Sequence, residues 1–131
     1  MHATDGARTG KPTVLLVDDD PVVVSLYAAM FRDGGYEVLT ACDGGEGFEH
    51  LKRGRPDAIV LDLSMPGMNG VEWLRAVRAD ARFEKVPIVI LTATKQPEQM
   101  RDALSSGVIV MHKHLADPDN VVRTVSRALR K

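Results

Sequence analysis

The fold of this chain is decided by the stretch AIVLDLSMPGMNG at residues 58–70. Four apolar residues lead directly into Asp62, and a turn rich in proline, glycine and asparagine follows at once. A short apolar run bounded by turn residues predicts a strand buried on both faces, which is typical of a parallel sheet. Asp62 then stands at the carboxyl end of that strand, where open α/β sheets build their ligand sites. Taken alone, this aspartate could equally cap the turn.

Length, charge and cysteine content restrict the class of protein. A chain of 131 residues is expected to form one domain that is large enough to bury a core. The formal net charge of −1 gives no electrostatic reason to expect nucleic-acid binding. The single cysteine, Cys42, excludes an internal disulfide, fits a reducing compartment and is interpreted as a small buried apolar residue. No apolar run is long enough for a membrane span and the amino terminus lacks a signal-peptide core, so we expect a cytoplasmic protein.

Apolar periodicity divides the rest of the chain into alternating strands and helices. Residues 1–12 are polar and show no periodicity, which predicts a disordered leader ahead of a single domain at 13–131. The pattern predicts four further strands, at 13–17, 36–40, 86–91 and 108–111, and five helices, at 21–33, 43–53, around 71–77, at 96–106 and at 117–131. In the first helix, Val22, Leu26 and Met30 recur at a spacing of four with Val23 beside them, which indicates the buried face.

Short strands that alternate with helices predict a parallel sheet joined by right-handed crossovers. The strand at 36–40 contains a charged residue and therefore suits an edge, whereas the strand at 13–17 is apolar throughout and suits the centre. This difference favours an α/β fold of the flavodoxin-like, doubly wound (βα)5 type, with the strand order 2-1-3-4-5.

Polar residues follow the strands at the edge where their carboxyl ends should meet. Asp18 and Asp19 follow the first strand, Asp62 the third, Thr92 the fourth and Lys113 the fifth. Because three clustered carboxylates repel one another, they favour a hard divalent cation, with Mg²⁺ the natural candidate. Together with a hydroxyl and an ammonium group, these residues predict a phosphoryl-transfer site in which Asp62 is the nucleophile.

The motifs of this chain resemble those of the receiver domain of two-component response regulators, and in particular the single-domain regulators of the chemotaxis type. The resemblance rests on LLVDDDP at 15–21, IVLDLSMPGMNG at 59–70, ILTA at 90–93 and Lys113, and it covers nearly the whole chain from Thr13 onward. It implies that Asp62 accepts a phosphoryl group from a sensor histidine kinase or a histidine phosphotransfer protein. The protein would then be a phosphoacceptor and not an enzyme, apart from slow self-dephosphorylation.

The resemblance also implies roles for the neighbouring residues and for one surface. Asp19, Asp62 and the backbone carbonyl of Ser64 would bind Mg²⁺ directly, and Asp18 would act through water. Thr92 and Lys113 would contact the phosphoryl group and pass the change to a face formed by residues 96–106 and 108–131. We expect a downstream protein partner on that face, no nucleic acid and no membrane, and either a monomer or a phosphorylation-dependent dimer.

The last strand departs from the receiver pattern. His114 stands where receivers have a proline after the lysine, and the run 108–111 has no aromatic residue. Gly107 lies one residue closer to Lys113 than in the receiver pattern, which indicates a deletion of one residue. Since a shift of register by one residue exchanges the two faces of a strand, His112 could take the place given to Lys113. His112 and His114 are otherwise interpreted as ordinary surface histidines and not as metal ligands.

Two other functions are open, the first suggested by these departures and the second by the acidic run at 18–20. One is a constitutive interaction module that keeps the receiver fold with a degraded switch and signals by binding alone. The other is a phosphatase of the haloacid-dehalogenase type, because Asp18 and Asp20 match its aspartate pair. Against the phosphatase, Pro21 follows where that class has a Gly-Thr pair, and the chain has no room for a cap domain.

Overall fold

The computed structural model describes residues 10–63, 65, 70–92, 108–112 and 117–130. These residues form a five-stranded sheet in which every pair of neighbouring strands is parallel, in the order β2-β1-β3-β4-β5. The strands are β1 (Thr13–Val17), β2 (Glu37–Ala41), β3 (Ala58–Asp62), β4 (Ile88–Thr92) and β5 (Val108–His112). This order confirms the predicted flavodoxin-like topology. The predicted helix over 96–106 and the first nine residues of the predicted leader lie outside the described residues.

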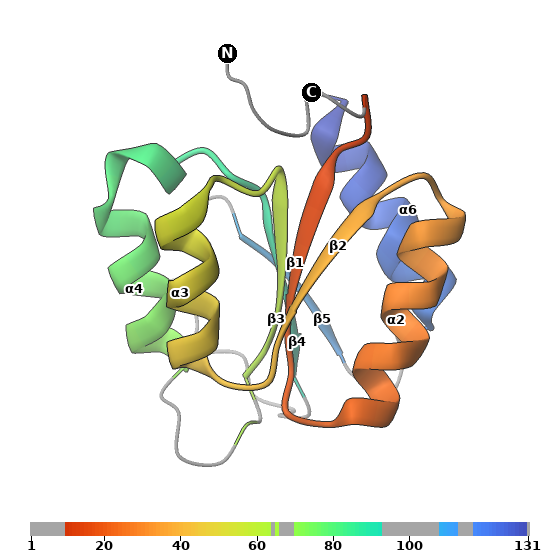
Figure 1. The fold of residues 1–131 in the computed structure, drawn as a ribbon, viewed down its shortest axis with the longest axis horizontal. Helices are drawn as coiled ribbons and strands as arrows, with labels where there is room; N and C mark the ends of the chain where they lie inside the picture. Colours follow the sequence, from red (N-terminus) through yellow and green to blue (C-terminus); the bar gives the residue numbers. More distant parts are fainter. Residues whose placement is uncertain (1–9, 64, 66–69, 93–107, 113–116, 131) are drawn as a thin grey trace.

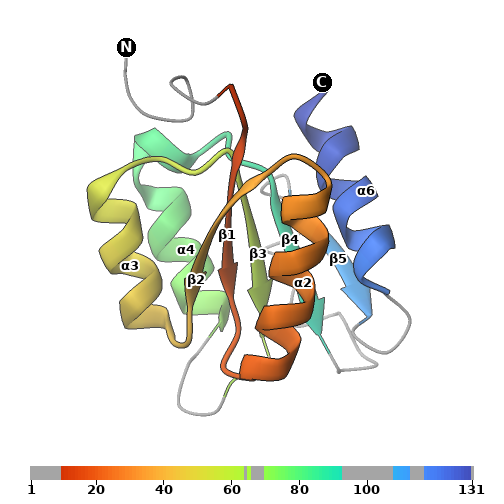
Figure 2. The ribbon, with the colours of Figure 1, turned by 45° about the vertical axis from the view of Figure 1, so that its right-hand side comes forward.

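The described helices cover both faces of the sheet (Figure 1). On one face lie α2 (Pro21–Asp33) and α6 (Pro118–Leu129), and on the other lie α3 (Gly44–Arg53) and α4 (Gly70–Ala79) (Figure 2). Three of these helices begin with an aspartate N-cap, at Asp20, Asp43 and Asp117, whose carboxylate accepts hydrogen bonds from backbone N–H groups of the first turn. No helix in the described part of the chain is long and apolar enough to cross a membrane.

The core consists of two layers, one on each side of the sheet. On the α3/α4 side, the strands contribute Leu15, Ile59 and Ile90, and on the α2/α6 side they contribute Leu16, Val60 and Leu91. All five residues of β3 and of β4 are buried, whereas β2 at the edge is half exposed. Burial on both faces explains why the central strands are continuous apolar runs up to Asp62 and Thr92 at their carboxyl ends, whereas β2 at the edge begins with the exposed Glu37.

The buried face of α2 differs from the one that the sequence predicted. Val22 is 75% exposed and Leu26 is 52% exposed, while the helix buries Tyr27, Ala28 and Phe31. The prediction was wrong for Val22 and Leu26 but not for Val23, which packs against the core. Valines at successive positions begin neighbouring apolar rows at a spacing of four, and the sequence does not show which row is buried. The row that ends in Tyr27 and Phe31 removes more apolar area from water, and packing therefore selects it. In the other row, Val22 and Leu26 face solvent and Met30 is half-buried.

The close packing of α3 against α4 requires a glycine at position 47. Trp73 of α4 is buried, donates a hydrogen bond from Nε1 to the carbonyl of Gly44 at 2.9 Å, and stacks on Phe48 with a distance of 5.2 Å between ring centroids. A Cβ atom at Gly47 would lie 2.9 Å from Cζ2 of Trp73. Because the ring is held on two sides, it cannot move away cheaply.

We expect Gly47→Ala to lower the free energy of unfolding by about 1 kcal/mol or more, since overpacking exceeds the gain in helix propensity. Gly45→Ala, two residues earlier in the same helix, is the matched control, because a Cβ atom there would meet only the Asp43 carboxylate, at 3.4 Å. That variant is expected to gain up to about 1 kcal/mol. Urea unfolding of the two variants measures both effects, and an equal gain in stability from both would contradict the close approach of Trp73.

Cys42 is exposed, which corrects the prediction that it is a buried apolar residue. It follows the last residue of β2 and precedes the N-cap of α3, so its side chain lies outside the core. Its thiol donates a hydrogen bond to Oε2 of Glu46 at 3.2 Å, and its backbone N–H donates to Oε1 of Glu46 at 3.0 Å. The hydrogen bond to Glu46 and the charge of this carboxylate raise the pKa of the Cys42 thiol, because both favour its protonated form.

A raised pKa leaves less thiolate at a given pH, so we expect Cys42 to react slowly with iodoacetamide near pH 8 despite its exposure. Glu46→Gln removes the charge and should accelerate alkylation several-fold by lowering the pKa of the thiol. Glu49→Gln, which changes a carboxylate of the same helix that instead pairs with Lys52 at 3.0 Å, should leave the rate unchanged. A pH profile of the alkylation rate measures the shift, and identical profiles for wild type and Glu46→Gln would contradict it.

Candidate functional site

Three carboxylates meet at the edge where the strands have their carboxyl ends. Asp18 follows β1, Asp62 ends β3, and together with Asp19 they place carboxylate oxygens within 4.8 Å of one another. Asp62 is 2% exposed and Asp18 is 6% exposed, whereas Asp19 faces solvent. The structure therefore brings together the three aspartates that the sequence predicted to converge.

Backbone hydrogen bonds fix the segment that carries Asp18. Its N–H donates to the carbonyl of Ala41 at 3.0 Å, which extends the pairing of β1 with β2 by one residue. Its side chain accepts a hydrogen bond at Oδ1 from the N–H of Asp20 at 2.9 Å, and Asp20 in turn caps α2. The turn between β1 and α2 thus holds the Asp18 carboxylate in one orientation. The sequence predicted the N-cap role of the Asp20 side chain but not this contact of its backbone N–H.

The strand that carries Asp62 is equally well fixed. Asp62 is the register partner of Leu91 on β4, and the N–H of Leu63 donates to the carbonyl of Leu91 at 3.0 Å. At the start of α4, a Cβ atom on Gly70 would overlap Cδ2 of Leu63. A larger residue at position 70 would therefore force the Leu63 side chain out of its present position between α4 and the end of β3.

Like charges and burial together determine what this site can bind. Two buried carboxylates beside a third repel one another in a poorly screened environment, and a divalent cation would relieve that repulsion. Their oxygen-only ligand set fits a hard ion such as Mg²⁺ better than a thiophilic metal. A second group that could hold an ion in the described part of the chain is Cys42, Asp43 and Glu46, whose members are all exposed.

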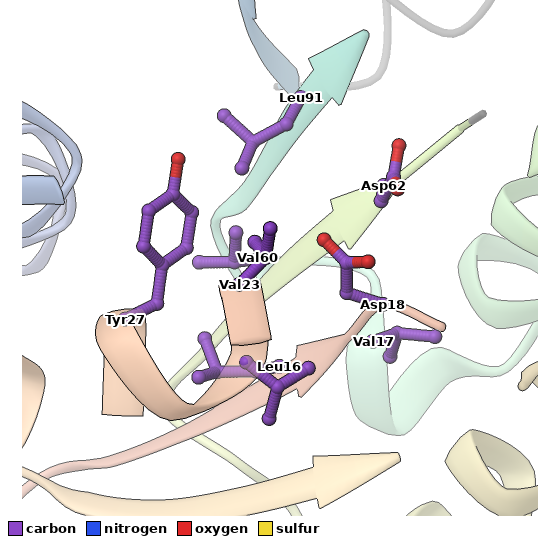
Figure 3. A pocket seen from close by; sticks show the side chains of 9 residues that line it. Leu16, Val17, Asp18, Val23, Tyr27, Val60, Asp62 and Leu91 are labelled. Atoms are coloured by element: carbon purple, nitrogen blue, oxygen red, sulfur yellow. The ribbon is translucent and has the colours of Figure 1, made fainter. Parts of the chain in front are cut away.

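Beneath the acidic site, a narrow crevice runs between the sheet and α2 (Figure 3). Its volume is about 10 Å³, room for one water molecule at most. The crevice is lined by Leu16, Val17, Asp18, Val23, Val24, Tyr27, Val60, Asp62 and Leu91. Sequence reasoning did not associate Tyr27 with the site, and the only signal was an aromatic residue in the second apolar row of α2.

Of the two phosphoryl-binding residues that the sequence predicted, the structure describes Thr92. It ends β4, is buried, and has His112 as its register partner on β5. Along β5, Val110 packs with the α3/α4 layer and Met111 with the α2/α6 layer. His112 therefore falls on the face of Val110 by the alternation of the strand. Lys113, Ser64 and His114 lie outside the described residues.

The sheet order and the acidic edge define an α/β domain of the receiver type. The model of the response regulator receiver domain matches residues 14–125. The chain belongs to this family, which acts in two-component signal transduction.

Named relatives agree with this assignment. The chain is 33% identical over 123 residues to the DNA-binding response regulator MtrA of Mycolicibacterium smegmatis. The aligned region covers 94% of this chain but only 53% of MtrA. It thus spans about half the length of that relative. Among solved structures, the chemotaxis response regulator CheY4 of Vibrio cholerae is 32% identical with a TM-score of 0.81, covering 90% of this chain and 98% of CheY4.

A third comparison concerns the acidic site. The receiver domain of sensor histidine kinase PA1611 from Pseudomonas aeruginosa is 30% identical with a TM-score of 0.79, covering 92% of this chain and 99% of that one. Its structure was solved with a magnesium ion coordinated in the active site cleft.

Proposed function

We propose that this protein accepts a phosphoryl group on Asp62 from a histidine-bearing donor, with Mg²⁺ bound beside it, and passes the signal to a protein partner. The observation that carries the proposal is the convergence of Asp18, Asp19 and Asp62, with oxygens within 4.8 Å of one another at the carboxyl edge of the sheet. Two of these carboxylates are buried, so the site is built into the core and is not a chance grouping of surface charges.

The residues present fit a magnesium ion. Asp19 and Asp62 would bind it directly and Asp18 through water, and the backbone carbonyl of Ser64 completes the proposed set. When bound, Mg²⁺ neutralises charge on the phosphoryl oxygens during transfer. The chain's own contribution is orientation: the hydrogen bond from Asp20 to Asp18 and the pairing of β3 with β4 hold the carboxylates before any ligand arrives.

The transfer itself exchanges one bond to phosphorus for another. An oxygen of the Asp62 carboxylate forms a bond to phosphorus while the bond from phosphorus to the donor's histidine nitrogen breaks. The nitrogen keeps the electron pair of that bond, and with the other ring nitrogen of the donor already protonated, the histidine leaves as a neutral imidazole. Thr92, at the end of the neighbouring strand, would donate its hydroxyl hydrogen to a phosphoryl oxygen. Such a protein is a phosphoacceptor and turns over no separate substrate.

The register of β5 supports Lys113, in preference to His112, as the pocket cation. Met111 packs in the α2/α6 layer, and the same layer contains Val60 and Leu91, the strand neighbours of Asp62. Alternation along an extended strand predicts position 113 on the face of Met111 and position 112 on the other face. We therefore propose that Lys113 pairs with the phosphoryl group.

The exposed row of α2 suits contact with the phosphoryl donor. Val22 and Leu26 lie on the solvent side of this helix, and the helix begins immediately after Asp18 and Asp19. Covering these two apolar side chains would favour association with a partner, because burial of apolar surface drives protein association. We propose that the histidine-bearing helix of a sensor kinase or phosphotransfer protein packs here, in the cytoplasm.

A second candidate is the constitutive interaction module, which the absence of an aromatic residue from β5 favours. The two are separated by NMR spectra recorded with Mg²⁺ and beryllofluoride, which mimics an aspartyl phosphate. A working switch predicts large shifts in β5 and α6 that are absent from Asp62→Asn. Shifts confined to the acidic edge would favour the constitutive module, and no beryllofluoride binding would overturn the proposed phosphoacceptor.

A further inference from the structure

Tyr27 is the aromatic side chain that lies between the acidic site and α2. It is 7% exposed and belongs to the core layer on the α2/α6 face. It lines the same crevice as Asp18, Asp62 and Leu91, and Figure 3 shows its ring beside Leu91 and Val60, with the two aspartates at the far end. None of the roles in phosphoryl transfer uses this residue.

Leu91 connects Tyr27 to the reacting end of the sheet. It is the register partner of Asp62, its carbonyl accepts the N–H of Leu63, and it directly precedes Thr92. Leu91 is therefore the described residue through which a movement of the Thr92 backbone toward a phosphoryl group would reach the crevice. The crevice has about 10 Å³ of space, which leaves Leu91 little room to move without pressing on the Tyr27 ring.

Among the described elements around the Tyr27 ring, α2, which carries Tyr27, is the one with an exposed side. Strands β3 and β4 are buried along their whole length. The second half of α2 is fixed, because Phe31 packs edge-on against Tyr36 with 5.2 Å between ring centroids, and Tyr36 shares a hydrogen bond of 2.7 Å with Ser126 of α6. The first half presents Val22 and Leu26 to solvent and is held by the Asp20 cap and by the packing of Val23 and Tyr27 on the sheet.

We propose that Tyr27 is a positioning residue that couples occupancy of the Asp62 site to the orientation of the first half of α2. The aromatic residue that β5 lacks is thus replaced, in this chain, by one on a helix at the other face of the sheet. Because Val22 and Leu26 sit on the same half of α2, phosphorylation changes the surface on which the donor docks and alters its affinity. This inference rests on the proposed function of Asp62.

The two tyrosines of the chain make a direct test possible. Both lie in the same core layer, Tyr27 beside the acidic edge and Tyr36 at the opposite end of α2. In protein labelled with 3-fluorotyrosine, the fluorine NMR spectrum contains two signals, which Tyr36→Phe assigns. With Mg²⁺ and beryllofluoride, the signal of Tyr27 is expected to shift and that of Tyr36 to stay, and Asp62→Asn should abolish the change.

The bound beryllofluoride gives its own fluorine signal in the same spectrum, which separates the two possible failures. Beryllofluoride bound with both tyrosine signals unchanged overturns the coupling and leaves the proposed function intact. No bound beryllofluoride overturns the proposed function, and the coupling falls with it.

A substitution tests whether the ring transmits the change or only reports it. In Tyr27→Leu, beryllofluoride should still bind, but the backbone amide shifts of Val22 and Leu26 on binding should fall by at least half. Tyr36→Leu makes the same replacement in the same layer and should leave those shifts as in wild type. Amide shifts of wild-type size in Tyr27→Leu would overturn the proposed role of Tyr27.

Discussion

Asp62→Asn is expected to abolish phosphoryl acceptance entirely, whereas Asp20→Asn should retain it. The asparagine amide cannot form a stable acyl phosphate, and the neighbouring strands offer no second carboxylate with the burial of Asp62, apart from Asp18. Asp20 lies two residues from Asp18 in the same acidic run, but its side chain caps α2. Asparagine is as good an N-cap as aspartate, so this control removes one charge without loosening the helix.

The measurement is the intact mass of each variant after incubation with Mg²⁺ and a small phosphodonor such as acetyl phosphate, followed by hydroxylamine treatment, which cleaves acyl phosphates. Wild type and Asp20→Asn should gain one hydroxylamine-sensitive phosphoryl group and Asp62→Asn none. Label that persists in Asp62→Asn but disappears in Asp18→Asn would favour the phosphatase-type use of Asp18 and contradict the proposed role of Asp62.

The strand order could be predicted because the degree of burial of each strand is reflected in how apolar its residues are. The fully buried strands β3 and β4 are unbroken apolar runs at 58–61 and 88–91, and the only charge within a strand's apolar run, Glu37, lies in β2 at the edge. Where a helix has two apolar rows, the sequence alone does not show which of them is buried. In α2, the choice between the row of Leu26 and that of Tyr27 depends on how much area each buries against the sheet.

The acidic site could be predicted because the geometry of a parallel sheet brings the carboxyl ends of its strands to one edge. Asp18, Asp19 and Asp62 needed no further information to be placed together. The crevice beneath them could not be predicted in this way, because its lining includes Tyr27 of α2. The apolar pattern of α2 indicated the wrong face of the helix as buried. Cys42 was misplaced for a similar reason: hydrophobicity scales count it as apolar, but the chain has already left β2 at Ala41.

Asp18→Asn is expected to raise stability without metal and to remove most of the stabilisation by Mg²⁺. In the wild type, a ligand present at 100 times its Kd stabilises the native state by about 2.7 kcal/mol. Replacing the buried Asp18 carboxylate by an amide relieves its repulsion with Asp62 and should stabilise the metal-free protein by about 1 kcal/mol or more. Asparagine keeps the carbonyl oxygen that accepts the N–H of Asp20. Thermal unfolding with EDTA and with increasing Mg²⁺ measures both effects.

Asp57→Asn is the matched control, because it removes a carboxylate from the opposite edge of the sheet. The Asp57 side chain accepts the N–H of Thr13 at 2.7 Å, and an asparagine oxygen can accept the same hydrogen bond. This variant should respond to Mg²⁺ as the wild type does, whereas Asp18→Asn should show little change over the same titration. If Asp18→Asn were less stable than the wild type in EDTA, attraction from neighbouring groups would outweigh the mutual repulsion of the carboxylates. An undiminished Mg²⁺ response in that variant would place the ion away from Asp18 and contradict the proposed site.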